Sequence, residues 1–200
     1  MMTVTVSGFN KRSYTPAVFL DRDGTIIELR DYLRRLDEIS LIAGAADGLK
    51  LLHDAGYLLI VITNQSGVAR GYFGEDFVKR ANEKITGLFA AQGVAIDAFY
   101  YCPHHPDYGD KIDCGCRKPK TGMIDRAASD FSIDLSRSWV IGDNISDIKT
   151  AVNAGLPSAL VMTGYGREII RDYPAHIKRP EVIADDLLDA ARQIISWKRG

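Results

Sequence analysis

Two aspartates stand two residues apart where a short apolar run ends. Ala17 to Leu20 is apolar throughout, and Asp21 and Asp23 follow directly in the stretch D-R-D-G-T. A short apolar run bounded by polar residues and glycine predicts a buried strand. Residues two apart on an extended chain point to the same side, so both carboxylates are expected to face one space. Such a pair needs a cation, a proton or a hydrogen-bond donor, and its oxygens suit Mg²⁺. The alternative is a helix start, where aspartate is a common cap.

Other residues of the chain supply the remaining parts of a phosphoryl-transfer site. That chemistry needs a nucleophile, neutralisation of the phosphate oxygens and an acid for the leaving group. Asp21 is suited to attack phosphorus and form an aspartyl-phosphate, and Asp23 to act as acid and then as base. Taken singly, the other candidates are more often a turn, a helix cap or a solvated lysine, so their order along the chain carries the specificity. They are Asp143 as a second Mg²⁺ ligand, Lys118 as the balancing cation, and Thr63 and Asn64 as hydrogen-bond donors to phosphate.

Apolar runs alternate with helical patterns along most of the chain. This alternation predicts an α/β fold, a three-layer sandwich with a mainly parallel sheet and helices on both faces. In such sheets the ligand lies beyond the carboxyl ends of the strands, which is where the polar candidates stand. After 17–20, strands are expected at 57–62, 96–101, 138–141, 159–162 and 182–183, and helices at 44–55, 75–92, 123–131, 146–154 and about 187–195.

A cluster of cysteines and histidines predicts a second metal site. C-P-H-H-P begins at Cys102, and C-G-C spans Cys114 to Cys116, which gives three thiolates and an imidazole from His104. These four groups are a complete tetrahedral set for zinc, and a closed set of protein ligands indicates a structural site. His105 is expected to be exposed or to lie behind the ligands. The zinc would hold the loop that carries Arg117 and Lys118 over the strand ends.

Composition limits the class of protein. The chain has 200 residues, is 46% hydrophobic and carries a net charge of −1. We expect one domain over 16–200, preceded by an N-terminal extension over 1–15. The charge gives no general attraction to nucleic acid or to anionic membranes, and no apolar run approaches the roughly 20 residues of a membrane span. With no apolar leader segment and with clustered cysteines, the expected location is the cytoplasm.

The order of these motifs resembles a known family. D-x-D-G-T, T-N-Q-S-G, R-K-P and G-D-N-x-x-D look like the four motifs of the haloacid dehalogenase (HAD) superfamily of phosphatases, over about 17–164. The resemblance implies a Rossmann-like fold, Mg²⁺ and an aspartyl-phosphate mechanism. It makes Asp21 the nucleophile and Asp23 the acid/base, which also reaches Mg²⁺ through its backbone carbonyl. It further implies Thr63 and Lys118 as phosphate ligands, Asp143 as a metal ligand, and Asp147 as an acid that positions Lys118 or a metal-bound water.

Longer stretches resemble one branch of that superfamily. T-N-Q-S-G-V-A-R-G, C-P-H-H-P and C-G-C-R-K-P are similar to the D-glycero-D-manno-heptose 1,7-bisphosphate 7-phosphatase group, whose zinc loop the histidinol-phosphate phosphatases share. The resemblance implies a small phosphorylated metabolite as substrate, most simply the heptose bisphosphate at its 7-phosphate. It places six residues at the substrate: Thr63, Asn64, Gln65, Ser66, Arg117 and Lys118.

Several alternatives remain open at this point. The chain departs from the heptose group at Ile27 and at 29–31. In this part of the chain Arg30, Arg34 and Arg35 either contact an anionic substrate or, as we favour, belong to a solvated loop. The segment between the first two motifs is too short for a large cap domain, so the zinc loop is expected to act as a partial lid. The substrate alternatives are histidinol phosphate, another small metabolite or a nucleic-acid 3′-phosphate; a non-catalytic phosphate-binding module is the alternative of another class. We expect a monomer.

Overall fold

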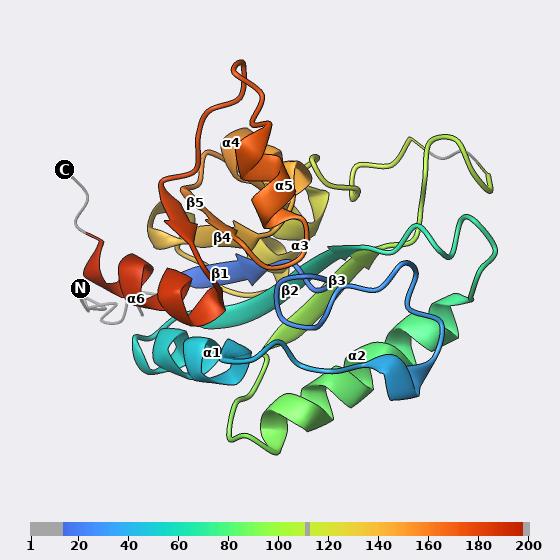
Figure 1. Cartoon of the computed structure of the whole chain (residues 1–200), viewed down its shortest axis with the longest axis horizontal. Helices are drawn as coiled ribbons and strands as arrows, with labels where there is room; N and C mark the ends of the chain where they lie inside the picture. The colour runs from blue at the N-terminus through green and yellow to red at the C-terminus, as the bar shows by residue number, and fades with distance from the viewer. Residues whose placement is uncertain (1–13, 111–112, 198–200) are drawn as a thin grey trace, which may run out of the picture.

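A six-stranded sheet forms the centre of the computed structural model, which describes residues 14–110 and 113–197 (Figure 1). All five strand pairs are parallel, in the order β3-β2-β1-β4-β5-β6. The order reverses beside β1, which pairs with both β2 and β4, and ligands of such sheets bind beyond the carboxyl ends at this point. The strands are β1 Ala17–Leu20, β2 Leu58–Asn64, β3 Ala98–Cys102, β4 Trp139–Gly142, β5 Ser158–Val161 and β6 Val182–Ala184.

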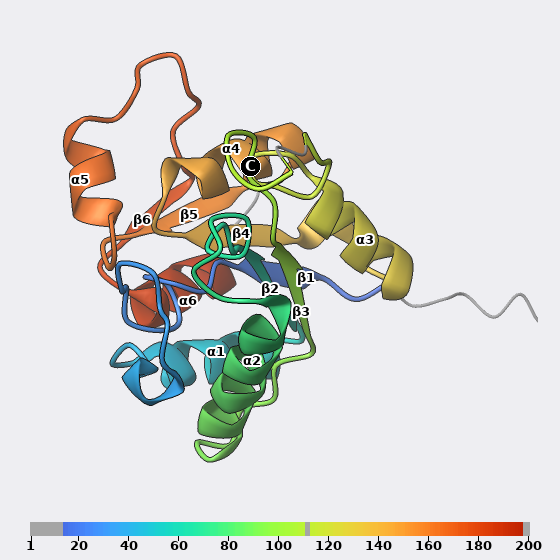
Figure 2. The same cartoon turned by 90° about the vertical axis from the view of Figure 1, so that its right-hand side faces the viewer.

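Helices cover both faces of the sheet (Figures 1 and 2). On one face lie α1 (Ala45–Asp54), α2 (Glu75–Ala90) and α6 (Leu187–Ser196), and on the other α3 (Gly122–Asp130) and α4 (Ile145–Ala154). The remaining elements are α5 (Gly166–Arg171) and two short 3₁₀ helices, Leu36–Glu38 and Leu135–Arg137. The predicted three-layer α/β sandwich with a parallel sheet is confirmed.

Alternate side chains of the central strands belong to two separate cores. Val18 and Leu20 pack in the core that α1, α2 and α6 cover, whereas Ala17 and Phe19 pack in the core under α3 and α4. Because successive residues of a strand point to opposite faces, a sheet covered on both sides requires strands without polar residues. This requirement explains the continuous apolar runs, and the polar side chains are left to the strand ends.

The loops beyond the carboxyl ends of β1, β2 and β3 surround the site. Within the described residues these segments, 21–44, 65–74 and 103–121, contain one 3₁₀ helix and no inserted domain. In the same described part of the chain, no helix is long and apolar enough to span a membrane.

Some expectations differ from the structure in detail. The short helix α5 was not predicted, β3 extends to Cys102, and Ile195 of α6 is exposed although it fits the apolar period of that helix. The predicted extension, 1–15, lies outside the described residues apart from its last two. Of these, Thr15 already pairs with Ile133.

Candidate active site

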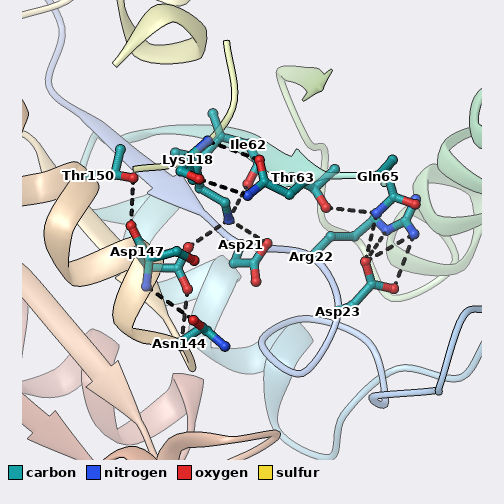
Figure 3. Close-up of polar contacts among 12 residues, drawn as sticks. Asp21, Arg22, Asp23, Ile62, Thr63, Gln65, Lys118, Asn144, Asp147 and Thr150 are labelled. Atoms are coloured by element: carbon teal, nitrogen blue, oxygen red, sulfur yellow. Dashed lines mark hydrogen bonds and ion pairs between the residues drawn. The ribbon is translucent and has the colours of Figure 1, made fainter. Parts of the chain in front are cut away.

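A buried lysine lies at the centre of the polar cluster beyond the strand ends (Figure 3). The ammonium of Lys118 contacts Asp21 Oδ1 at 2.7 Å and Asp147 Oδ1 at 2.6 Å, and donates to the carbonyl oxygen of Ile62 at 2.9 Å. The ammonium thus has two hydrogen bonds and a second ion pair, and the residue is only 4% exposed. Burial alone would lower the pKa of Lys118, but Asp147 and Asp21 hold it above its usual value. Lys118 is therefore charged, and it orients Asp21.

Three carboxylates meet around this lysine. Oxygens of Asp21, Asp143 and Asp147 lie within 4.8 Å of one another. Burial, with the charges of Asp21 and Asp147, raises the pKa of Asp143 to about 8. Burial also raises the pKa of Asp147 to about 6, although Lys118 opposes this shift. One ammonium does not balance three carboxylates, so the donor set fits a hard divalent cation such as Mg²⁺.

Two glycines allow the carboxylate of Asp143 to reach this position. A Cβ added at Gly24 would lie 2.3 Å from Asp143 Oδ2, and one added at Gly164 would lie 1.9 Å from it. Both glycines have positive φ, 87° and 50°, which favours glycine in any case. The same oxygen accepts the backbone N–H of Tyr165 at 2.8 Å. The glycine of D-x-D-G-T is thus required by the packing of another motif's aspartate.

The carboxylate of Asp23 turns toward a separate set of donors. Arg22 donates to both of its oxygens, at 3.0 and 3.1 Å, and Gln65 Nε2 donates to Oδ2 at 2.9 Å. The same amide nitrogen lies 2.9 Å from Thr63 Oγ1 and donates to it. Because Gln65 uses its amide in this way, the hydroxyl hydrogen of Thr63 remains free for another acceptor.

The side chain of Asn64 ties two motifs together. Its Oδ1 accepts the backbone N–H of Lys118 at 3.0 Å, and its Nδ2 donates to the backbone carbonyl of Lys118 at 3.1 Å. This pair of bonds spans 54 residues of sequence and fixes the R-K-P segment against the end of β2. The Lys118 side chain is thereby directed at the strand ends.

Two adjoining pockets open above these residues. The first, of about 310 Å³, is lined by Asp21, Asp23, Thr63, Asn64, Arg117, Lys118 and Asp143, together with Leu29, Asn144, Ser146 and Tyr165. The second, of about 260 Å³, is lined by Arg30, Asp31, Tyr32, Gln65 and Ser66 among others. Asp23, Asn64 and Tyr165 belong to both. All the residues predicted at the catalytic centre and the substrate therefore line one of two neighbouring cavities.

The cysteine loop forms a compact cluster of potential metal ligands. The Sγ atom of Cys116 lies 3.0 Å from that of Cys102, 3.2 Å from that of Cys114 and 3.5 Å from His104 Nδ1. These separations exceed the roughly 2.0 Å of a disulfide bond, and the three thiols are free. The four ligand atoms lie within 4.8 Å of one another, a donor set that fits tetrahedral zinc. His105 stays outside the cluster, with its ring against Tyr108.

The arginines of the surrounding loops have different surroundings. Arg117 lines the first pocket and donates to the backbone carbonyl of His104 at 3.2 Å, which links it to the cysteine loop. Arg30 lines the second pocket. Arg34 stacks over the ring of Tyr72 at 4.3 Å, and Arg35 pairs with exposed Asp37. Among Arg30, Arg34 and Arg35, only Arg30 therefore lines one of the two pockets.

Sequence reasoning did not identify several residues that build the site. Arg22, Asn82 and Gly164 belong to no recognisable pattern of their own, and Tyr165 contributes only a backbone N–H.

Comparisons with known proteins identify the class that the fold and site define. Residues 115–190 match the HAD-hydrolase-like family model. A D-glycero-D-manno-heptose-1,7-bisphosphate 7-phosphatase of Thermosynechococcus vestitus is 41% identical over 90% of this chain and 95% of its own length. A D-glycero-beta-D-manno-heptose-1,7-bisphosphate 7-phosphatase of Haemophilus ducreyi is 44% identical over 74% of this chain and 84% of its own.

A solved structure agrees with these relatives. The D,D-heptose 1,7-bisphosphate phosphatase of B. bronchiseptica, complexed with magnesium and phosphate, superposes with a TM-score of 0.81 at 31% identity, over 90% of this chain and 98% of that chain. The protein is thus a HAD-type phosphatase, a phosphoric monoester hydrolase. Within that superfamily the chain belongs to the heptose bisphosphate phosphatase family.

Proposed function

We propose that this protein is a Mg²⁺-dependent phosphatase that hydrolyses D-glycero-D-manno-heptose 1,7-bisphosphate at the 7-phosphate. The observation that carries the proposal is the buried cluster in which Lys118 orients Asp21 beside two further carboxylates, at the base of a pocket of about 310 Å³. The names of the relatives supply the substrate.

Asp21 is the nucleophile in this proposal. Its Oδ1 is held by Lys118, which leaves the second oxygen outside the ion pair and able to attack phosphorus. The new bond joins Asp21 to phosphorus while the bond from phosphorus to the sugar oxygen breaks. The proton of Asp23 passes to that leaving oxygen. Water then returns a proton to Asp23, attacks phosphorus and releases phosphate, which restores Asp21.

Neighbouring groups hold the phosphate while these bonds change. Thr63 is placed to donate its free hydroxyl hydrogen, and Lys118 balances the negative charge of phosphate and nucleophile. Asn64, predicted as a direct phosphate donor, has its side chain bonded to the backbone of Lys118, so we assign it to positioning Lys118. In this proposal Gln65 likewise positions other side chains, since its amide donates hydrogen bonds to Asp23 and Thr63.

The magnesium ion would be held by the carboxylates of Asp21 and Asp143 and by the backbone carbonyl of Asp23. When bound, it neutralises charge on the transferring phosphate and on the carboxylates. The raised pKa of Asp143 supports this assignment, because burial and neighbouring anions are the cause and a cation would offset both. Asp147 is bonded to Lys118 and to the backbone of Asn144, so we place it behind the metal ligands.

Zinc would be held by Cys102, His104, Cys114 and Cys116. Such a site closes a loop whose last ligand directly precedes Arg117 and Lys118. The structural role fits a closed donor set, which offers no position for water or substrate. Arg117 lines the first pocket and Ser66 the second, and we assign both residues to the part of the substrate beyond the reacting phosphate.

The test is phosphate release from a panel of substrates with Mg²⁺ present. The panel contains both anomers of the heptose bisphosphate, histidinol phosphate, fructose bisphosphate and a 3′-phosphorylated oligonucleotide. We expect the highest kcat/KM for a heptose bisphosphate and no release by the Asp21→Asn variant. Equal, weak rates on all substrates would contradict the heptose assignment, and retained activity in Asp21→Asn would contradict the mechanism.

A further inference from the structure

The carboxylate of Asp23 is held by two nitrogens of the planar guanidinium of Arg22, Nε and Nη2, which we call the Arg22 fork. Arg22 Nε donates to Asp23 Oδ2 at 3.0 Å, and Arg22 Nη2 donates to Asp23 Oδ1 at 3.1 Å. Gln65 Nε2 adds a second donor to Oδ2 at 2.9 Å (Figure 3). A paired arginine–carboxylate geometry of this kind fixes the plane of the carboxylate as well as its distance.

The fork is itself anchored from a helix. Arg22 is 1% exposed, and its third nitrogen, Nη1, donates to Asn82 Oδ1 at 3.1 Å. Asn82 is only 8% exposed and lies on the apolar face of α2, between Ala81 and Ile85 of the same core-facing surface. A polar side chain in such a position is unfavourable unless it is bonded, and Asn82 receives this bond from Arg22 across 60 residues of sequence.

A simple structural reading explains part of this arrangement. A buried guanidinium needs partners, and Asp23 and Asn82 supply them. The need for partners does not explain why a charged residue is buried here at all. Arg22 lies in the sequence directly between the proposed nucleophile, Asp21, and the proposed acid/base, Asp23. The guanidinium is placed so that two of its nitrogens face the reacting carboxylate and the third faces the scaffold.

We propose that Arg22 and Asn82 are positioning residues that fix the carboxylate of Asp23 for proton transfer to the leaving oxygen. The inference rests on the proposed role of Asp23 as acid/base. Each carboxylate oxygen has two in-plane lone pairs. On Oδ2 both are taken, by Arg22 and Gln65, whereas on Oδ1 only one is taken, by Arg22. Among these contacts, Oδ1 is thus the oxygen that keeps an in-plane lone pair for the leaving oxygen of the substrate.

Loss of the anchor should affect substrates unequally. A sugar alkoxide is a poor leaving group and needs a well-placed proton, whereas p-nitrophenolate leaves without one. General acid catalysis contributes about 10²- to 10⁴-fold, so partial misplacement of Asp23 should cost roughly tenfold in kcat/KM for an alkyl phosphate; kcat/KM reports the transfer of the phosphoryl group to Asp21 and not the later hydrolysis, which is the same for every substrate. For p-nitrophenyl phosphate we expect less than about a threefold change, because the other parts of the site are untouched.

The experiment compares kcat/KM of Asn82→Leu on the two kinds of substrate, the heptose bisphosphate and p-nitrophenyl phosphate. Asn82→Asp retains the acceptor oxygen, so the ratio of its rates on the two substrates should be closer to that of the wild type than the ratio in Asn82→Leu. Glu83→Gln, at an exposed neighbouring position of α2, is the matched control and should leave both rates unchanged. Arg22→Lys keeps the charge without the fork, and it should show the same selective loss if Asn82→Leu does not fold.

The outcomes separate the two proposals. A selective loss of kcat/KM on the alkyl phosphate supports the positioning role. An equal loss of kcat/KM on both substrates, with the wild type active, overturns the positioning role and leaves the proposed function intact. A wild type that releases no phosphate from either substrate overturns the proposed function, and the positioning role with it.

Discussion

Removal of the Lys118 ammonium should destabilise the fold strongly. In Lys118→Met the side chain keeps its apolar volume but Asp21 and Asp147 lose their buried cation, which lies 2.7 and 2.6 Å from them. Removal of one partner of a buried ion pair costs about 3–5 kcal/mol, because the other charge is left uncompensated. For a chain of this length such a loss lowers the unfolding midpoint by roughly 6–20 °C.

The assay is urea unfolding at neutral pH, with and without added Mg²⁺. Lys120→Met is the control, because Lys120 pairs with Asp113 at the surface, where an ion pair contributes about 0–1 kcal/mol. The double variant Lys118→Met/Asp147→Asn should be more stable than Lys118→Met, since it removes one of the two unpaired charges. A loss below about 1 kcal/mol in Lys118→Met, or no recovery in the double variant, would refute the buried-charge reasoning.

Three further outcomes are expected. Replacement of Cys114 and Cys116 by serine should abolish the roughly one zinc per chain found by elemental analysis and lower the thermal midpoint. Partial burial alone would raise the pKa of Glu181. Hydrogen bonds from Lys178 and from the backbone N–H of Ser158 nevertheless hold this pKa below its usual value. Glu181 thus adds stability above its unfolded pKa that is lost as the pH falls through the lower folded pKa, and Glu181→Gln should remove this part of the pH dependence. Gly164→Ala should weaken Mg²⁺ binding, because the added Cβ would overlap the carboxylate of Asp143.

Each of these predictions has a control. For the zinc site, His105→Ala alters a histidine outside the cluster and should keep the metal. For the pH dependence, Glu168→Gln alters an exposed glutamate of α5, and a similar acid profile in both variants would contradict the role of Glu181. For the glycine, Gly74→Ala places a Cβ in open space. Unchanged Mg²⁺ affinity in Gly164→Ala would show that Asp143 is not confined as described.

The alternation of apolar runs was sufficient to predict the parallel sheet and its layers. Each central strand is buried on both faces, so its sequence contains no polar residue until the site begins, as at Asp21. The short helix α5 could not be predicted, because six residues are too few to show a helical period. Ile195 fits the period of α6 and is nevertheless exposed, since periodicity does not say how far the covering core extends.

Site membership was predictable, but the direction of each side chain was not. The order of the motifs predicted that Asp21 and Lys118 lie in one site although 97 residues separate them. No local pattern indicates this proximity. The motif around Gln65 predicted contact with substrate, whereas its amide is bonded to Asp23 and Thr63. The amide of Asn64 is likewise bonded to the backbone of Lys118. Hydrogen-bond partners depend on the packing of distant segments, which sequence spacing alone does not specify.

The central claim is that Asp21 carries the phosphoryl group during turnover. The most direct measurement is borohydride reduction of the protein during hydrolysis of the heptose bisphosphate, followed by mass spectrometry of the peptide that contains residue 21. Reduction of an aspartyl-phosphate converts that aspartate to homoserine, so we expect homoserine at position 21 only when substrate is present. Turnover without modification at that position, or modification of another carboxylate instead, would contradict the assignment of Asp21 as the nucleophile.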